Sequence, residues 1–194
     1  MSAKNLLSIF LSLAVFVIGA SAIYFFGAQQ RTNRPELKSE DKIANIEGLN
    51  EGDLVNLPTL TSITGETISL NLLKEKTVLC VFFTPTCAGC AKDIELWKDL
   101  HAESTNRGVA FFIIDVGTDR EALKKFVAAY KLQNLPVLSD PNHKVGPALK
   151  INFVPEYLLF ANGGKVLHRW DGVRNYDQAK DRERVGEFFR FSAD

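Results

Sequence analysis

The chain has 194 residues, of which 46% are apolar and 24% are charged, and its formal net charge is zero. This balance argues against broad electrostatic attraction to nucleic acid, and the apolar content excludes disorder of the whole chain. Three cysteines are too few for a scaffold built from disulfides. We therefore expect one ordinary folded domain with an additional segment, and no nucleic-acid partner.

The first element of the chain is an uncharged apolar run from Leu6 to Ala28. A helix that crosses a bilayer needs about 20 apolar residues, so we predict an N-terminal transmembrane anchor within residues 1–28. A cleaved signal peptide is the alternative, because residues 20–22 (Ala-Ser-Ala) have the small-x-small form of a cleavage site. Basic residues after the run favour a cytoplasmic domain by the positive-inside rule, whereas the cysteine chemistry described below favours an extracytoplasmic one.

Residues 29–51 are polar and charged and are expected to form a linker, followed by a folded domain over residues 52–194. Two short strand-like segments on either side of Gly65 predict a hairpin at the start of this domain. Alternating strands and helices then indicate an α/β fold, a three-layer sandwich with a central mixed sheet and helices on both faces. The strands are expected over 78–83, 109–116, 137–138, 157–160 and 166–170, and the helices over 87–104, 119–130 and 182–191.

A pair of cysteines, Cys87 and Cys90, lies where the buried strand over 78–83 gives way to a helix. The two residues between them place both sulfurs on the first turn of that helix, where they are able to close a disulfide ring. The free backbone N–H groups of that turn favour a thiolate at the first cysteine. We therefore expect Cys87 to be the exposed nucleophile and Cys90 the resolving thiol.

Other uses of a cysteine pair fit the sequence less well. A structural zinc site would need a second pair of ligands, and the three histidines are scattered along the chain. A haem attachment motif needs a histidine where Ala91 stands. We therefore expect no metal and no cofactor, and a pair of inert buried thiols is the remaining alternative.

Several further residues are expected to be structural. Cys80 is interpreted as an apolar filler of the core strand, Trp97 and Trp170 as packing residues, Asp115 as a cap at the end of a strand, and His143 as a loop residue.

The domain resembles the thioredoxin superfamily, in particular its membrane-anchored ResA/TlpA/CcmG-like thiol–disulfide oxidoreductases with a redoxin or AhpC-TSA-like domain. The resemblance covers about residues 52–194 and is carried by the stretch from 78 to 90 and by the apolar-Pro-x-aromatic strand over 154–160. It implies a cis peptide bond between Val154 and Pro155, which presents backbone beside Cys87 for a substrate peptide to pair with as an added strand. Thr86 and Val154 are then substrate-binding residues.

Some positions depart from the family's pattern. Thr86 stands where a tryptophan usually precedes the first cysteine, Val81 where many thioredoxins bury an aspartate, and Glu95 where the family has a helix-kinking proline. Asp93, three residues after Cys90 on the same helix face, is similar to the acidic residue of the ResA-like motif. We predict that Asp93 accepts the proton of Cys90, and an ordinary solvated helix carboxylate is the alternative.

The resemblance implies a thiol–disulfide oxidoreductase that is held in a membrane by its N-terminal helix, with its domain on the periplasmic or outer face. Its partners would be protein disulfides or dithiols. Relatives commonly act as reductants, often in cytochrome c maturation or copper-centre assembly, and a membrane electron donor such as a DsbD/CcdA-like protein keeps them reduced. The client protein is not specified by these residues.

Two other classes of protein remain as alternatives. An SCO-like copper chaperone would use His143 as a third ligand, although its cysteines are spaced by three residues rather than the two found here. A peroxiredoxin would use Thr84, three residues before Cys87, but Cys80 occupies the place of the proline in the peroxidatic motif.

Overall fold

A computed structural model describes residues 48–56, 58–70, 76–117 and 119–191. The predicted membrane anchor and most of the predicted linker lie outside these residues, so both stay predictions. Within the described ranges, no helix has the length and apolar character that a membrane crossing requires.

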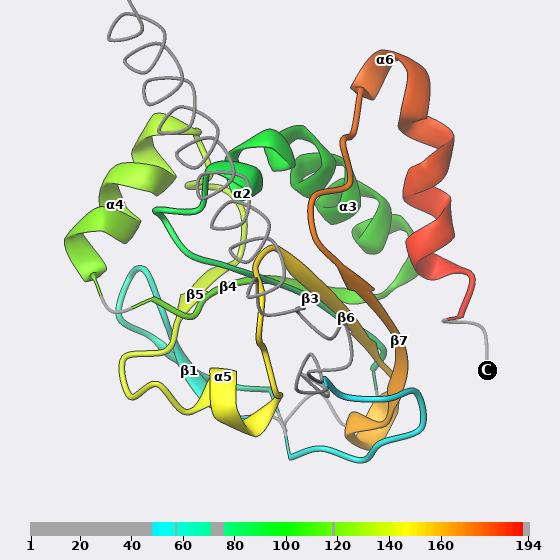
Figure 1. Cartoon of the computed structure of the whole chain (residues 1–194), viewed down its shortest axis with the longest axis horizontal. Coiled ribbons are helices and arrows are strands. Elements are labelled where there is room, and N and C mark those ends of the chain that lie inside the picture. The colour runs from blue at the N-terminus through cyan, green and yellow to red at the C-terminus, as the bar shows by residue number, and fades with distance from the viewer. Residues whose placement is uncertain (1–47, 57, 71–75, 118, 192–194) are drawn as a thin grey trace, which may run out of the picture. The chain divides into compact units, whose positions relative to one another are not determined.

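Among the described residues, seven strands form one mixed sheet in the order β2-β1-β5-β4-β3-β6-β7 (Figure 1). The central strand β3 pairs in parallel with β4 and antiparallel with β6, and β1 and β2 form the predicted antiparallel hairpin. The expected mixed sheet and its core strands are therefore confirmed. The strands are β1 (Thr59–Ser62), β2 (Thr67–Ser69), β3 (Val78–Phe83), β4 (Ala110–Asp115), β5 (Val137–Ser139), β6 (Glu156–Phe160) and β7 (Val166–Asp171).

Helices cover both faces of this sheet, as the sequence predicts. In Figure 1, α3 and α4 lie on one side of the strands and α5 lies on the other. The helices are α2 (Ala88–Lys92), α3 (Ile94–Arg107), α4 (Arg120–Ala129), α5 (Val145–Ala148) and α6 (Gln178–Asp181), with 3₁₀ helices η2 (Asn162–Gly164) and η3 (Arg182–Phe189).

The strand that leads to the cysteine pair is buried along its whole length, which its uninterrupted apolar sequence explains. Successive side chains of a strand point to opposite faces, so β3 contributes to two cores. Phe83 packs on the face of α3, α4 and η3, whereas Cys80 packs on the face of α5. Burial raises the pKa of the Cys80 thiol, which keeps it protonated and inert, as expected for a core filler.

The prediction of one continuous helix over 87–104 is wrong in one respect, because the helix breaks at Asp93 into α2 and α3. The backbone N–H of Asp93 donates to the carbonyl of Cys90 rather than one residue further back, which tightens the last turn of α2. Glu95 stands where the family has a helix-kinking proline, so the break in this helix does not depend on a proline. The second helix continues to Arg107 and ends at Gly108, whose φ of 69° is left-handed.

Two smaller differences concern the other helices. The sequence predicts no helix at α5, because its four residues include Gly146 and Pro147 and carry no apolar periodicity. The helix predicted over 182–191 is instead the 3₁₀ helix η3, preceded by α6. Its apolar side chains are nevertheless buried as expected, namely Val185, Phe188 and Phe189.

Candidate active site

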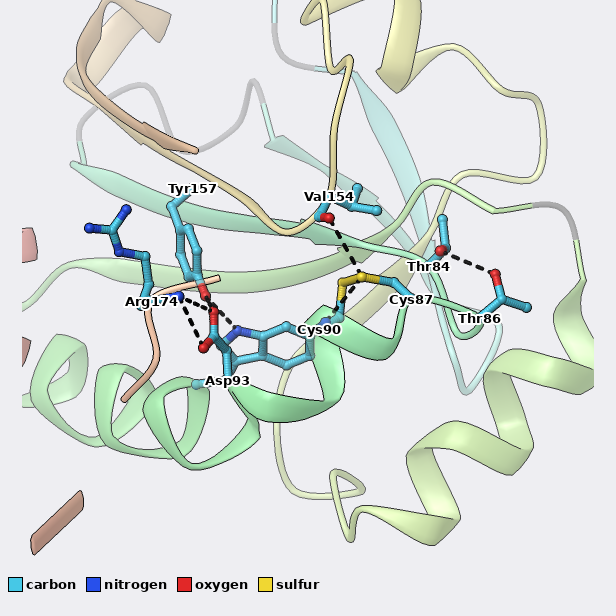
Figure 2. The surroundings of a disulfide bond; sticks show 9 residues. Thr84, Thr86, Cys87, Cys90, Asp93, Val154, Tyr157 and Arg174 are labelled. Atoms are coloured by element: carbon cyan, nitrogen blue, oxygen red, sulfur yellow. Dashed lines mark hydrogen bonds between the residues drawn. A yellow bond between two sulfur atoms is a disulfide. The ribbon is translucent and has the colours of Figure 1, made fainter. Parts of the chain in front are cut away.

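The cysteine pair begins the helix that follows β3. Cys87 is the N-cap of α2, and a disulfide joins it to Cys90, with 5.3 Å between the two Cα atoms (Figure 2). The backbone N–H of Cys90 donates to the Cys87 sulfur over 3.0 Å, which favours a thiolate there after reduction. Cys87 is half-buried, whereas Cys90 is fully buried. A partner sulfur therefore has access to Cys87 and not to Cys90.

The strand β6 approaches the pair from the other side. The peptide bond between Val154 and Pro155 is cis, and the carbonyl oxygen of Val154 lies 3.5 Å from the Cys87 sulfur (Figure 2). The structure thus brings Val154 and Pro155 to the reactive cysteine, in the place that the family resemblance implies. Backbone in this position is suited to pairing with an extended substrate peptide.

Thr86 lies at the rim of the same site. Its side chain is exposed, and its hydroxyl lies 3.4 Å from that of Thr84 (Figure 2). The contacts of the Cys87 sulfur are with Cys90 and the Val154 carbonyl. A closed disulfide between Cys87 and a neighbouring cysteine suits thiol–disulfide exchange better than the peroxide chemistry of a peroxiredoxin.

The carboxyl group of Asp93 is fully buried where α2 meets α3. It accepts a hydrogen bond of 2.7 Å from the Tyr157 hydroxyl and bonds of 2.9 and 3.2 Å from the backbone N–H of Arg174 (Figure 2). Burial raises the pKa of Asp93, and these hydrogen bonds partly oppose that rise. The alternative of a solvated carboxylate is therefore wrong, while the role of proton acceptor for Cys90 stays a prediction.

Two aromatic residues extend the Asp93 network. Trp97 on α3 donates from its indole Nε1 to the Tyr157 hydroxyl over 3.1 Å, and its ring packs edge-on against Phe83 at 5.3 Å. Trp97 thus packs on the sheet as expected. The sequence pattern did not single out Tyr157, although a tyrosine inside a buried strand signals a need for a polar partner. It also missed Arg174, which acts through its backbone and so has no side-chain signal.

Glu156 is a second buried carboxyl group that sequence reasoning missed. It follows Pro155 directly, is fully buried, and accepts a hydrogen bond of 3.2 Å from the Arg169 guanidinium. Burial raises its pKa to about 7, against the opposing effect of Arg169. The available signal was the placement of an acidic residue at the start of an otherwise apolar strand.

This burial predicts that Glu156→Gln makes the free energy of unfolding less sensitive to pH. The pKa is about 7 in the folded chain and near the ordinary 4.5 in the unfolded chain. The contribution of protonated Glu156 to the free energy of unfolding is therefore fully present below about pH 4.5. It is lost as the pH rises towards 7, by up to about 3 kcal/mol. Denaturant unfolding at pH 4.5 and pH 8 measures the difference. The exposed Glu183→Gln is the matched control, and parallel pH profiles for Glu156→Gln and the wild type would contradict the prediction.

Asp115 and His143 lie where the sequence predicts them. Asp115 ends β4, where one carboxylate oxygen accepts from the backbone N–H of Gly117 over 2.8 Å, and burial raises its pKa to about 6. His143 is exposed in the loop after β5. Among the residues the structure describes, no group of three or more histidine, cysteine or acidic side chains is arranged to hold a metal ion.

A buried central strand that delivers a cysteine pair to a cis-proline strand is the arrangement of a thioredoxin-like thiol–disulfide oxidoreductase, and this chain is one. It belongs to the AhpC/TSA family, whose sequence profile matches residues 52–169. Among curated proteins, the thiol-disulfide oxidoreductase ResA of Bacillus subtilis (strain 168) is 27% identical over 124 residues, which span 64% of this chain and 69% of that protein.

Solved structures share the fold. A putative thiol:disulfide interchange protein DsbE from Chlorobium tepidum has a TM-score of 0.62 and 20% identity, over 73% of this chain and 96% of that chain. A putative protein disulfide isomerase from Bacteroides thetaiotaomicron has a TM-score of 0.61 and 21% identity, over 75% of this chain and 92% of that chain. At such identities these structures establish the thioredoxin-like fold.

Proposed function

We propose that the protein is a membrane-tethered reductant of protein disulfides, with its thioredoxin-like domain outside the cytoplasm. The clients are extracytoplasmic proteins in cytochrome c maturation or a related assembly process. A membrane dithiol donor such as a DsbD/CcdA-like protein restores the reduced pair. The similarity to ResA supports this assignment, and the uncharged run from Leu6 to Ala28 supports the tether.

The reaction consists of two thiol–disulfide exchanges. The Cys87 thiolate attacks one sulfur of the client disulfide, forms a mixed disulfide and expels the other client sulfur as a thiolate. Cys90 then loses its proton and attacks the Cys87 sulfur, which closes the Cys87–Cys90 disulfide and releases the second client thiolate. The client gains two electrons and, after protonation, two hydrogens, and the cysteine pair loses them. The donor dithiol reverses these steps on the oxidised pair.

The observation that carries these roles is the unequal burial of the two cysteines. Cys87 is half-buried beside the Val154 carbonyl, whereas Cys90 is fully buried. Attack on a disulfide sulfur proceeds along the extension of the S–S bond, from the side opposite the leaving sulfur. Because Cys90 is fully buried, protein surrounds its sulfur, whereas the partly exposed Cys87 is the cysteine that a partner sulfur is able to reach.

The direction of electron flow is tested by the reduction potential of the full-length protein in detergent. The pair is equilibrated in thiol redox buffers, and alkylated cysteines are counted by mass. A two-electron couple near or below about −250 mV is expected for a reductant, and a value near about −120 mV would instead assign a disulfide donor. A dithiol that never closes to a disulfide would overturn the exchange reaction itself.

The location of the domain is tested by labelling in intact cells. A membrane-impermeant maleimide, added after mild reduction, is expected to react with Cys87 before the cells are lysed, because this cysteine is the accessible one of the pair. The Cys87→Ser variant is the control for specificity, since Cys80 and Cys90 are buried. Labelling that requires lysis would place the domain in the cytoplasm, as the basic residues after the apolar run suggest.

A further inference from the structure

A chain of hydrogen bonds connects Arg184, on the C-terminal 3₁₀ helix η3, to the buried carboxyl group of Asp93. The guanidinium Nη2 of Arg184 donates to the carbonyl of Arg174 over 3.3 Å. The backbone N–H of the same Arg174 donates to both carboxyl oxygens of Asp93, over 2.9 and 3.2 Å (Figure 2). Arg184 therefore holds the short stretch of backbone that binds this carboxyl group.

The charged and titratable groups around Asp93 come from different parts of the chain. Among the described residues, those that act on its carboxyl group are Tyr157 from β6, Arg174 from the segment after β7 and Arg184 from η3. The Cys90 thiol belongs to α2, three residues before Asp93. Burial raises the pKa of Tyr157 and keeps it protonated, so the positive charge comes from the two arginines. Both arginines lower the pKa of Asp93, against the effect of burial.

Arg184 acts on the site through its side chain, whereas Arg174 contacts Asp93 through its backbone. The guanidinium group of Arg184 has two partners, since Nη1 lies 3.2 Å from Oδ2 of Asp181 while Nη2 donates to the Arg174 carbonyl. The side chain is half-buried, so solvent screens its charge only in part. Arg174 and Arg184 both lie beyond residue 169, where the match to the family profile ends, so the profile does not describe these contacts.

We propose that Arg184 is a positioning residue for the resolving step, because it keeps the buried Asp93 carboxyl in the ionised form that accepts the proton of Cys90. The inference rests on the exchange reaction proposed above and on Asp93 as its proton acceptor, and it specifies what controls the release of the client. In that step the Cys90 proton passes to the Asp93 carboxylate, the Cys90 sulfur bonds to the Cys87 sulfur, and the client leaves as a thiolate. A protonated Asp93 is unable to take this proton.

The experiment measures the single-turnover release of a peptide thiol by the reduced full-length protein in detergent, as a function of pH. Release is expected to accelerate as the pH rises through the pKa of Asp93. Arg184→Gln keeps a donor for the Arg174 carbonyl and removes the charge. It is expected to move this acceleration upward by about half a pH unit, the scale of a partly exposed ion pair, and so to slow release about threefold at a pH below the transition.

Two further variants separate charge from structure. Arg184→Lys keeps the positive charge and is expected to recover most of the wild-type profile. Arg190→Gln is the matched control, because the exposed Arg190 at the end of η3 also pairs with an acidic residue three positions earlier, and its profile is expected to equal that of the wild type. An unchanged profile in Arg184→Gln, an equal shift in Arg190→Gln or no recovery in Arg184→Lys would overturn the inference.

A second readout does not depend on disulfide exchange. The ionisation of Asp93 is followed by ¹³C NMR of the full-length protein labelled at its aspartate carboxyl carbons, with Asp93→Asn identifying the signal. Its midpoint is expected to rise in Arg184→Gln and to stay in place in Arg190→Gln. An unmoved midpoint in Arg184→Gln would overturn the inference and leave the exchange reaction in place. A wild type that releases no peptide would overturn the proposed function, whatever the midpoints show.

Asp181→Asn tests the same charge from the opposite direction. The carboxylate of Asp181 pairs with Arg184 and accepts from the backbone N–H of Asp177, and an asparagine keeps an oxygen for both contacts. Removing its negative charge leaves more of the Arg184 charge uncompensated, so the acceleration is expected to move to lower pH. A disturbed η3 would instead displace the profile in the same direction in Asp181→Asn and Arg184→Gln, and that outcome would overturn the inference.

Discussion

Replacing Cys87 with serine is expected to abolish disulfide exchange, whereas replacing Cys90 with serine is expected to stop the reaction at a mixed disulfide. The first variant lacks the sulfur that a client reaches, since Cys90 is fully buried. The second keeps the accessible nucleophile but lacks the thiol that releases the client. Turnover should fall to the background rate of the buffer thiols in both variants, although only Cys90→Ser should retain a covalently bound client.

The measurement is intact-protein mass after incubation of each variant with a peptide disulfide, together with the steady-state rate of peptide reduction. Cys80→Ala serves as the control, because Cys80 lies in the core strand away from the pair and its removal should leave both exchange steps intact. If Cys87→Ser were the variant that accumulates the covalent adduct, the assigned roles of the two cysteines would be reversed.

The parts of this fold that the sequence predicts are those fixed by local pattern. The apolar run over 78–83 is buried on both faces in the structure, and the next strands begin and end within two residues of their predicted limits. Cys87 caps the start of α2, as the spacing of the pair implies. The cap is a local contact, because the Cys87 sulfur accepts a hydrogen bond from the nearby backbone N–H of Cys90. Local sequence is sufficient where the determining contacts are local.

The parts that the sequence does not predict depend on contacts between distant segments. The break at Asp93 accompanies bonds to Tyr157 and to the backbone of Arg174, which lie 64 and 81 residues further along the chain. Val173 reaches Gly89 only because β7 returns antiparallel beside β6 and then turns at Gly172. A contact made through backbone atoms does not depend on the type of residue, so the sequence pattern does not predict it.

Two of these distant contacts share one residue, Asp93. The Asp93 carboxyl joins α2 and α3 to β6 through Tyr157 and to the segment after β7 through Arg174. It therefore lies at the junction of the elements that carry the second cysteine, the cis-proline strand and the segment that carries Arg174. A residue in this position has two separable effects, one on the position of the surrounding backbone and one on proton transfer.

Asp93→Asn is expected to slow the resolution of the mixed disulfide by about a hundredfold at pH 7, the lower range for loss of a general base. The amide retains an oxygen that accepts from Tyr157 and Arg174, so the backbone arrangement is largely preserved. In the wild type, resolution should accelerate as the pH rises through the pKa of Asp93, because the ionised carboxylate is the form that accepts the Cys90 proton. This acceleration should be absent in Asp93→Asn, as single-turnover release of a client peptide would show.

Tyr157→Phe separates the two effects, because it keeps the carboxylate and removes one hydrogen bond from it. That bond lowers the pKa of Asp93, so its loss should raise the pKa further and move the acceleration to higher pH. A proton acceptor therefore predicts a displaced profile in Tyr157→Phe and a flat one in Asp93→Asn. A purely positioning role predicts that neither substitution moves the pH of the acceleration, and that outcome would refute proton transfer by Asp93 while leaving its connections to Tyr157 and Arg174 intact.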